Sequence, residues 1–235
     1  MPKSMKIVSW NANCKFREKY TEIAKLGADI YVIQECENPE TSKSEEYRDF
    51  VKNGFWIGDI PFKGLMVFSP NPEINLELLN WSTQDYRFFL PIRVNDRFTL
   101  VGSWACNPYI QEFTDFLHTA KEHIDKGSII LGDLNSNVIF DKDNYKTGKT
   151  HSKIVEEFRE IGLEDIYHFK SGDEQGKEKV PTFYLYRHLD KPYHIDHCFA
   201  APEVVKKMTI HARWQWLTLS DHLPIEIELN NISEE

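Results

Sequence analysis

Short runs rich in β-branched and aromatic residues recur along the whole chain, and most are bounded by polar or turn-forming residues. They predict strands at 6–10, 30–33, 65–68, 88–94, 98–104, 129–131, 182–186, 195–200, 204–211 and 225–229. Ten or so strands, partly in hairpin-like succession, indicate two packed sheets rather than one.

Three segments between these strands have the period of an amphipathic helix. The clearest, 109–124, has apolar residues at steps of three and four along one face, namely Ile110, Phe113, Leu117, Ala120 and Ile124. Segments 16–26 and 153–161 show the period more weakly. We therefore expect an α+β fold in layers, with helices flanking the sheets. No repeat or low-complexity linker divides the chain, which predicts a single domain over residues 1–235.

The charge balance of the chain is acidic. Its 28 Lys and Arg against 37 Asp and Glu give a formal net charge of −9, whereas sequence-independent binding to duplex DNA depends largely on Lys and Arg that neutralise phosphates. Such binding is not expected. A cleft that holds a divalent cation remains compatible, because carboxylates bind the cation and the cation can meet a phosphate.

No apolar run approaches the length of about 18 residues typical of a membrane span, and no signal-peptide pattern opens the sequence. Cys14, Cys36, Cys106 and Cys198 lie far apart without a C-x-x-C pair, so neither a disulfide framework nor a structural zinc site is indicated. These features predict a cytoplasmic protein without a membrane span, and we expect a monomer.

Polar clusters lie at the ends of four predicted strands. They are Ser9-Trp10-Asn11, Gln34-Glu35, Gly132-Asp133-Leu134-Asn135 and Ser220-Asp221-His222. Taken singly, each fits ordinary turn chemistry, and short motifs give many false matches. Together they supply hard oxygen ligands, a carboxylate base, amide donors and a histidine, the groups needed to attack a phosphorus centre with a divalent metal.

Asp196 lies inside the apolar run 195–200, where an unpaired carboxylate would be costly to bury. A hydrogen bond to the imidazole of His222 would give it a partner, fix the tautomer and stabilise the imidazolium. The alternative is an exposed Asp on an edge strand.

These motifs resemble, in type and order, those of the endonuclease/exonuclease/phosphatase superfamily. That family includes enzymes like deoxyribonuclease I and exonuclease III, sphingomyelinases and inositol polyphosphate phosphatases. The matching pieces are Trp10-Asn11, Gln34-Glu35, Gly132-Asp133-Leu134-Asn135, Ile195-Asp196 and Ser220-Asp221-His222, and they extend over nearly the whole chain. The resemblance implies a four-layer α/β/β/α sandwich with the site at one end of the two sheets.

The resemblance also implies a metal site. Glu35 would be the main ligand of Mg²⁺ or Mn²⁺, assisted by Asn11 and Asp221, in keeping with the preference of Mg²⁺ for oxygen ligands. A thiolate site is not expected, although each cysteine lies near a motif, because the oxygen-rich set favours a hard cation.

Catalytic and substrate-binding roles follow from the same resemblance. Asp133 would activate the attacking water, while Asn135 and Asn11 would hold phosphate oxygens. His222, paired with Asp196, would stabilise the negative charge that builds up in the transition state.

Four further residues near the predicted site bear on the substrate or on the chemistry. Asn107, after the strand 98–104, resembles a substrate-binding asparagine of the repair enzymes. In that alignment Trp104 falls where many relatives carry Tyr or His, and a second general acid would be missing because an indole only donates hydrogen bonds; Trp104 as a plain core residue is the alternative. Trp214 and Trp216 would either stack on bases or pack at the rim of the site.

The leading prediction is a Mg²⁺-dependent phosphodiester hydrolase, a nuclease acting on single-stranded, nicked or damaged DNA. A phosphatase or phosphodiesterase of a small molecule or lipid headgroup is the alternative. A non-catalytic binding module of the same fold is a third class, but such a module would not need Asp133, Asp196 and His222 together.

Overall fold

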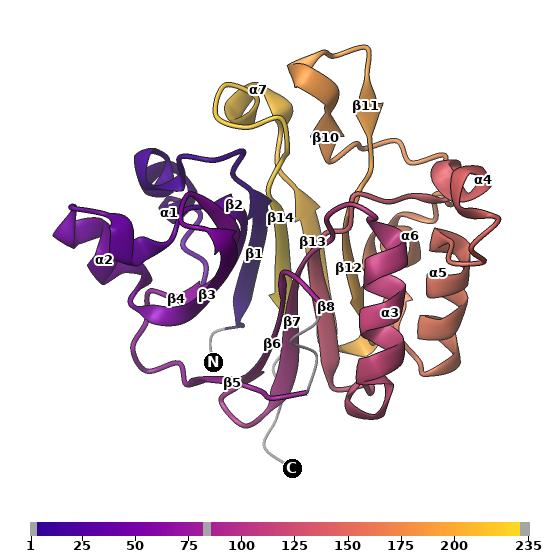
Figure 1. Cartoon of the computed structure of the whole chain (residues 1–235), viewed down its shortest axis with the longest axis horizontal. Helices are drawn as coiled ribbons and strands as arrows, with labels where there is room; N and C mark the ends of the chain where they lie inside the picture. Colours follow the sequence, from indigo (N-terminus) through magenta and orange to yellow (C-terminus); the bar gives the residue numbers. More distant parts are fainter. Residues whose placement is uncertain (1–3, 82–85, 231–235) are drawn as a thin grey trace.

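Two six-stranded sheets pack face to face in the computed structural model, which describes residues 4–81 and 86–230. Helices cover the outer face of each sheet, so that the layers run α/β/β/α (Figure 1). The four-layer sandwich that the sequence predicts is confirmed.

The first sheet has the strand order β13-β14-β1-β2-β4-β3. Its strands are β1 (Lys6–Asn11), β2 (Ile30–Cys36), β3 (Asn53–Ile60), β4 (Lys63–Ser69), β13 (Val205–Ile210) and β14 (Ile225–Leu229). Strands β1 and β2 are parallel, and the other neighbours are antiparallel.

The second sheet has the order β5-β6-β7-β8-β12-β9. Its strands are β5 (Leu76–Leu78), β6 (Phe89–Val94), β7 (Phe98–Trp104), β8 (Ser128–Asp133), β9 (Glu164–Asp165) and β12 (Asp196–Ala200). Here β7 and β8 are the parallel pair. A separate hairpin joins β10 (Phe183–Tyr184) to β11 (Pro192–Tyr193).

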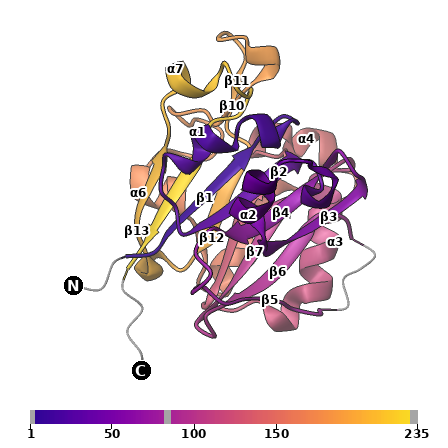
Figure 2. The same ribbon diagram turned by 90° about the vertical axis from the view of Figure 1, so that its left-hand side faces the viewer.

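The helices divide between the two outer layers (Figure 2). On the side of the first sheet lie α1 (Tyr20–Ala24) and α2 (Glu45–Val51). On the side of the second lie α3 (Ile110–Ala120), α4 (Asp141–Asn144) and α5 (His151–Glu160). Helix α6 (Ile166–Ser171) packs against β12 and β13, and α7 (Arg213–Trp216) lies above the sheets. Within the described ranges no helix is both long and apolar enough to cross a membrane.

Three apolar clusters hold the layers together, one between the sheets and one under each helical layer. The sheets approach each other closely at Gly102 of β7, where a Cβ would lie only 2.5 Å from Cγ2 of Val67 in β4. A side chain at this position would push the sheets apart, so the missing Cβ permits the observed spacing.

The observed strands extend four of the predicted ones by one to three residues at an end, match two and shorten four. The helix predicted at 109–124 is α3 followed by one 3₁₀ turn. The edge strand β3 was not predicted. None of its residues is fully buried, and its apolar pattern is correspondingly weak. The strand predicted at 182–186 is shorter than expected, because Tyr186 has a left-handed backbone (φ 53°) and ends it in a turn.

Candidate active site

Strand direction brings the polar clusters to one edge of the sandwich. Because β1 and β2 are parallel, Asn11 and Glu35 reach the same edge of the first sheet. In the second sheet Asp133 ends β8, and Asp196 begins the antiparallel β12 directly opposite it. His222 comes three residues before β14, which runs antiparallel to β1. The structure thus assembles the residues that the sequence motifs nominated.

Asp133 is fully buried and accepts three hydrogen bonds. Nδ2 of Asn11 donates to Oδ2 at 2.9 Å, and Asn135 donates its backbone N–H to Oδ1 at 2.8 Å and its Nδ2 to Oδ2 at 3.1 Å. The bond from Asn11 joins the two sheets. Burial raises the pKa of Asp133 well above its ordinary value, although His222 and the hydrogen bonds oppose this shift. A carboxylate with a raised pKa is a better general base.

His222 lies between two carboxylates. Its Nδ1 is 2.9 Å from Oδ2 of Asp196, and its Nε2 is 3.9 Å from Oδ2 of Asp133. Burial alone would lower the pKa of His222, but Asp196 and then Asp133 outweigh it and raise the pKa to about 10. The ring is therefore an imidazolium at neutral pH, and the predicted bond between His222 and Asp196 is present.

Two hydroxyl groups that the sequence analysis did not nominate position this pair. Oγ1 of Thr182 accepts the backbone N–H groups of Ile195 and Asp196, each at 3.1 Å, and so fixes the start of β12. Oγ of Ser220 donates to the carbonyl of Asn11 at 2.7 Å and accepts from the N–H of His222 at 3.1 Å. Ser220 is part of the cluster Ser220-Asp221-His222 but was given no role there, and Thr182 has no local signal in the sequence.

Glu35 occupies a bulge in β2. The pairing of β2 with β4 shifts between Gln34 and Cys36, and Glu35 takes a left-handed backbone with φ of 54°. A bulge redirects a side chain out of the strand's alternation, and a non-glycine residue in this region costs on the order of 1 kcal/mol or more. The side chain keeps 19% of its surface exposed.

The surroundings of Glu35 fit a hard divalent cation. Nζ of Lys63 lies 3.1 Å from Oε2, and Sγ of Cys14 lies 3.9 Å from the same atom. Both contacts are made by Oε2, and within the described residues no hydrogen bond reaches Oε1. Asn13 holds two further oxygens. Its backbone N–H donates to Oδ1 of Asn11, and its Nδ2 donates to Oδ1 of Asp221, each at 2.9 Å. Carboxylate and amide oxygens of this kind are the ligands that hard divalent cations prefer.

Asp133, Asp196 and His222 also offer ligand atoms within 4.8 Å of one another. In this group both carboxylates raise the pKa of His222 and favour its protonated form.

The cysteines are poor candidates for ligands in this cleft. All four are free. Burial raises the pKa of Cys106 to about 12, and burial together with Glu35 raises that of Cys14. The thiols therefore stay protonated at neutral pH, whereas a metal needs the thiolate.

Comparison with solved structures identifies the fold. The chain superposes on a 3′ phosphatase from Neisseria, NExo, bound to a product DNA hairpin, with a TM-score of 0.69, 16% identity and coverage of 96% of this chain and 99% of that one. An AP endonuclease from Archaeoglobus fulgidus superposes with a TM-score of 0.69 and 17% identity, over 96% of this chain and 99% of that one. The endonuclease domain of TRAS1, a telomere-specific non-LTR retrotransposon, superposes with a TM-score of 0.64 and 15% identity, over 97% of this chain and 98% of that one. The chain therefore shares its fold with these phosphatase and endonuclease structures. No protein-family model matches the sequence, and a sequence search of curated proteins gives no significant match.

Trp104 is a core residue of this fold. It is 4% exposed, its ring centre lies 4.7 Å from that of Phe88, and Nζ of Lys63 lies 5.2 Å from the ring. The interpretation as plain core is therefore the one that holds. Asn107 is exposed beyond β7, where its backbone carbonyl accepts a hydrogen bond from Arg87 at 2.7 Å. Its role in binding substrate stays a prediction.

The two tryptophans of α7 differ in their surroundings. Trp214 is 79% exposed, whereas Trp216 is completely buried and packs edge-on against Trp10 with ring centres 5.3 Å apart. The prediction that Trp216 stacks on bases is wrong, because a buried ring offers no face to a ligand. Trp214 remains a candidate.

Helix α7 and the hairpin β10–β11 rise together beyond the ends of the sheets (Figures 1 and 2). The backbone N–H of Tyr184 donates to the carbonyl of Asp221 at 2.8 Å. The ring of Phe183 packs on that of His222, with the ring centres 4.5 Å apart. Trp214 and Tyr186, which is 76% exposed, are therefore carried on segments that adjoin His222.

Proposed function

We propose that the protein is a metal-dependent phosphodiesterase that cleaves DNA. The observation that carries this proposal is the geometry of Asp133, a buried base held by Asn11 and Asn135, beside the His222–Asp196 pair. The fold supports it, and the structural neighbours described above include a phosphatase bound to a DNA hairpin and two endonucleases.

In the proposed reaction a water molecule attacks phosphorus while Asp133 takes its proton, and the bond to the leaving oxygen breaks. Asn11 and Asn135 orient the Asp133 carboxylate through their side-chain amides. The imidazolium of His222 stabilises the negative charge on the phosphoryl oxygens, and Asp196 keeps it protonated and in place. Mg²⁺, held by Glu35 with help from Asn11 and Asp221, would supply a Lewis acid for a phosphoryl oxygen.

Single-stranded, nicked or damaged DNA is the substrate that the surface features favour. Because the chain carries a net charge of −9, extended binding to duplex phosphates is disfavoured. Exposed aromatic rings such as Trp214 and Tyr186 instead suit unpaired bases, which stack on them regardless of sequence. Arg187 and Arg213 on the same two segments add positive charge.

The proposal is tested with a soluble phosphodiester, bis-p-nitrophenyl phosphate, and then with single-stranded, nicked and abasic DNA. Hydrolysis should require Mg²⁺ or Mn²⁺ and stop with EDTA. Glu35→Gln and His222→Asn should each lower turnover by about a hundredfold or more. Glu122→Gln and His118→Asn, at exposed positions on the outer helices, serve as matched controls.

Turnover that is indifferent to EDTA would contradict the metal assignment. Hydrolysis of inositol phosphates or sphingomyelin in preference to every DNA substrate would instead favour a phosphatase or lipid phosphodiesterase.

A further inference from the structure

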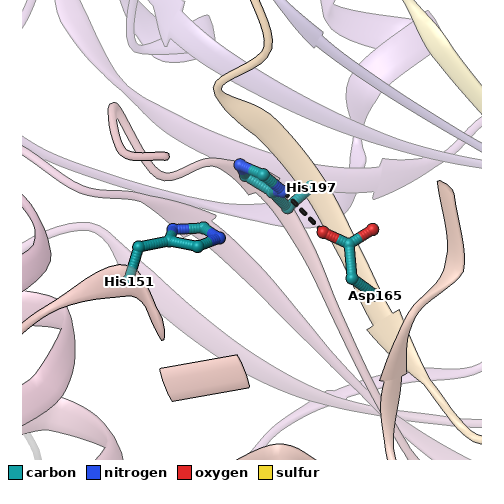
Figure 3. A group of neighbouring side chains, drawn as sticks. All are labelled: His151, Asp165 and His197. Carbon is teal, nitrogen blue, oxygen red and sulfur yellow. Dashed lines mark hydrogen bonds and ion pairs between the residues drawn. The ribbon is translucent and has the colours of Figure 1, made fainter. Parts of the chain in front are cut away.

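A second polar cluster lies behind the active site, on the opposite face of β12. Successive residues of a strand point to opposite faces, so Asp196 faces His222 while His197 faces the outer layer of helices. There His197 meets Asp165 at the end of β9 and His151 at the first turn of α5 (Figure 3). All three side chains are at most 1% exposed.

The hydrogen bonds of this cluster follow a pattern typical of metal-binding histidines. Such a histidine usually donates its outer N–H to a backbone carbonyl and turns the other nitrogen to the metal. Nε2 of His197 lies 2.9 Å from the carbonyl of Ser136, and its Nδ1 faces Oδ2 of Asp165 at 2.9 Å. His168 likewise directs Nδ1 to the carbonyl of Asp173 at 2.9 Å. Its Nε2 lies 3.3 Å from Oε1 of Glu178 and 3.8 Å from the same oxygen of Asp165, so it would have to turn from Glu178 to bind a metal beside Asp165.

His151 supplies the most direct sign that a ligand is missing. Its Nδ1 lies 3.3 Å from the hydroxyl of Ser136, and its buried Nε2 has no hydrogen-bond partner in the described part of the chain. In Figure 3 its ring lies beside the His197–Asp165 pair, with the ring edge turned toward them.

The ligand atoms of three residues are grouped closely enough for one metal ion to reach all of them. One ligand atom from each of His151, Asp165 and His197 lies within 4.8 Å of the other two. Ligands bound at about 2.0–2.1 Å in a tetrahedron are roughly 3.3 Å apart, so small side-chain rotations would close the site.

We propose that His151, Asp165 and His197, with His168 as the fourth ligand, bind one Zn²⁺ ion in a closed structural site. Imidazole nitrogens with one carboxylate select a first-row transition ion over Mg²⁺ or Ca²⁺. Four protein ligands leave no open position, which is typical of structural rather than catalytic zinc. On binding, the metal takes the place of a proton at Nδ1 of His197, and that proton leaves to solvent.

The proposed ion would brace the catalytic loop. His197 contacts the carbonyl of Ser136, the residue after Asn135, and Asn137 donates to the carbonyl of His194 at 2.9 Å. Fixing His197 would therefore fix the backbone that presents Asn135 to Asp133.

The experiment is a metal titration of purified, chelator-stripped protein with Zn²⁺ or Co²⁺ in the presence of excess Mg²⁺. We expect one equivalent of Co²⁺ with the intense visible absorption of tetrahedral coordination, and a rise in the melting temperature with Zn²⁺ but not with Mg²⁺. His151→Gln and Asp165→Asn should lose the bound equivalent. Glu35→Gln, in the active site, and His118→Gln, an exposed histidine of α3, should retain it.

The proposal is overturned if the wild-type protein binds no equivalent of Zn²⁺ or Co²⁺, or if binding is lost in Glu35→Gln and kept in His151→Gln. If the cluster variants fail to fold, the proposal is decided by Glu35→Gln alone, from the number of Co²⁺ equivalents that it binds and from its Co²⁺ absorption spectrum. The weak spectrum of six-coordinate Co²⁺ there would exclude the site. Neither readout depends on nuclease activity.

Discussion

Asp133 and Asp196 lie directly opposite each other on β8 and β12, and the imidazole of His222 lies between their carboxylates. Two buried anions therefore surround one ring. This arrangement raises the pKa of the ring, and the shared low-dielectric surroundings raise that of Asp133. The pH dependence of the enzyme should report both shifts.

The first prediction concerns the pH profile of kcat/KM. The reaction needs Asp133 deprotonated and His222 protonated. Because the pKa of Asp133 is raised, the rate should fall with acidification well above pH 4, the usual range of a carboxyl group, which is about 3.9 for Asp. Because the pKa of His222 is raised to about 10, the rate should be lost only as the pH passes that value. An acid limb at or below pH 4 would remove Asp133 as the base.

The second prediction concerns Asp196→Asn. This change removes the strongest of the interactions that raise the pKa of His222, so the alkaline limb of the profile should move toward neutral pH. Turnover at pH 7 should fall by about a hundredfold, in the range observed when one electrostatic contact to a transition state is lost. An unchanged alkaline limb would mean that a group other than His222 sets it. Asp143→Asn, on α4, is the control.

The third prediction concerns Lys63, which shares the carboxylate of Glu35. Lys63→Met should lower the Mg²⁺ concentration for half-maximal activity by roughly two- to fivefold, since a partly exposed ion pair is worth about 0–1 kcal/mol. A Mg²⁺ titration of activity measures this, with Lys52→Met, paired to Asp49 on α2, as the control. A higher Mg²⁺ requirement would show instead that Lys63 supports the cation, for example by orienting Glu35.

The fourth prediction separates the tryptophans of α7. Trp214→Ala should weaken binding of single-stranded DNA by about tenfold or more and leave the melting temperature unchanged, because base stacking on an exposed ring contributes about 1–3 kcal/mol. Trp216→Ala should destabilise the fold by about 3–5 kcal/mol through the cavity that it leaves. Binding assays at fixed salt and thermal melts distinguish the two. Equal DNA affinity in Trp214→Ala and wild type would rule out stacking there.

The sequence predicted the strands that carry the site because each combines a local apolar run with a polar end. It did not predict β3, whose side chains are nowhere fully buried, nor the bulge at Glu35, which has no glycine to mark it. Contacts such as that of Thr182 with Asp196 depend on which segments become neighbours, and no local pattern encodes this.

The error at Trp216 has a geometric cause. Two residues apart, Trp214 and Trp216 would share one face of a strand. In α7 they are separated by roughly 200° around the helix axis, so one is exposed and the other buried. Their spacing in the sequence alone does not say which of the two rings is exposed.

In the proposed reaction, the hydrogen bond from Asn11 to Asp133 would give the interior of the sandwich a part in setting the rate. Its donor belongs to one sheet and its acceptor to the other, so its length follows the separation of the sheets. A methyl group at Gly102, buried between Val67 and Val32, would widen that separation and misalign the base without touching the substrate. Misplacement by about an ångström can cost a hundredfold in rate. Catalytic proficiency in this fold is therefore a property of its central packing as much as of its rim.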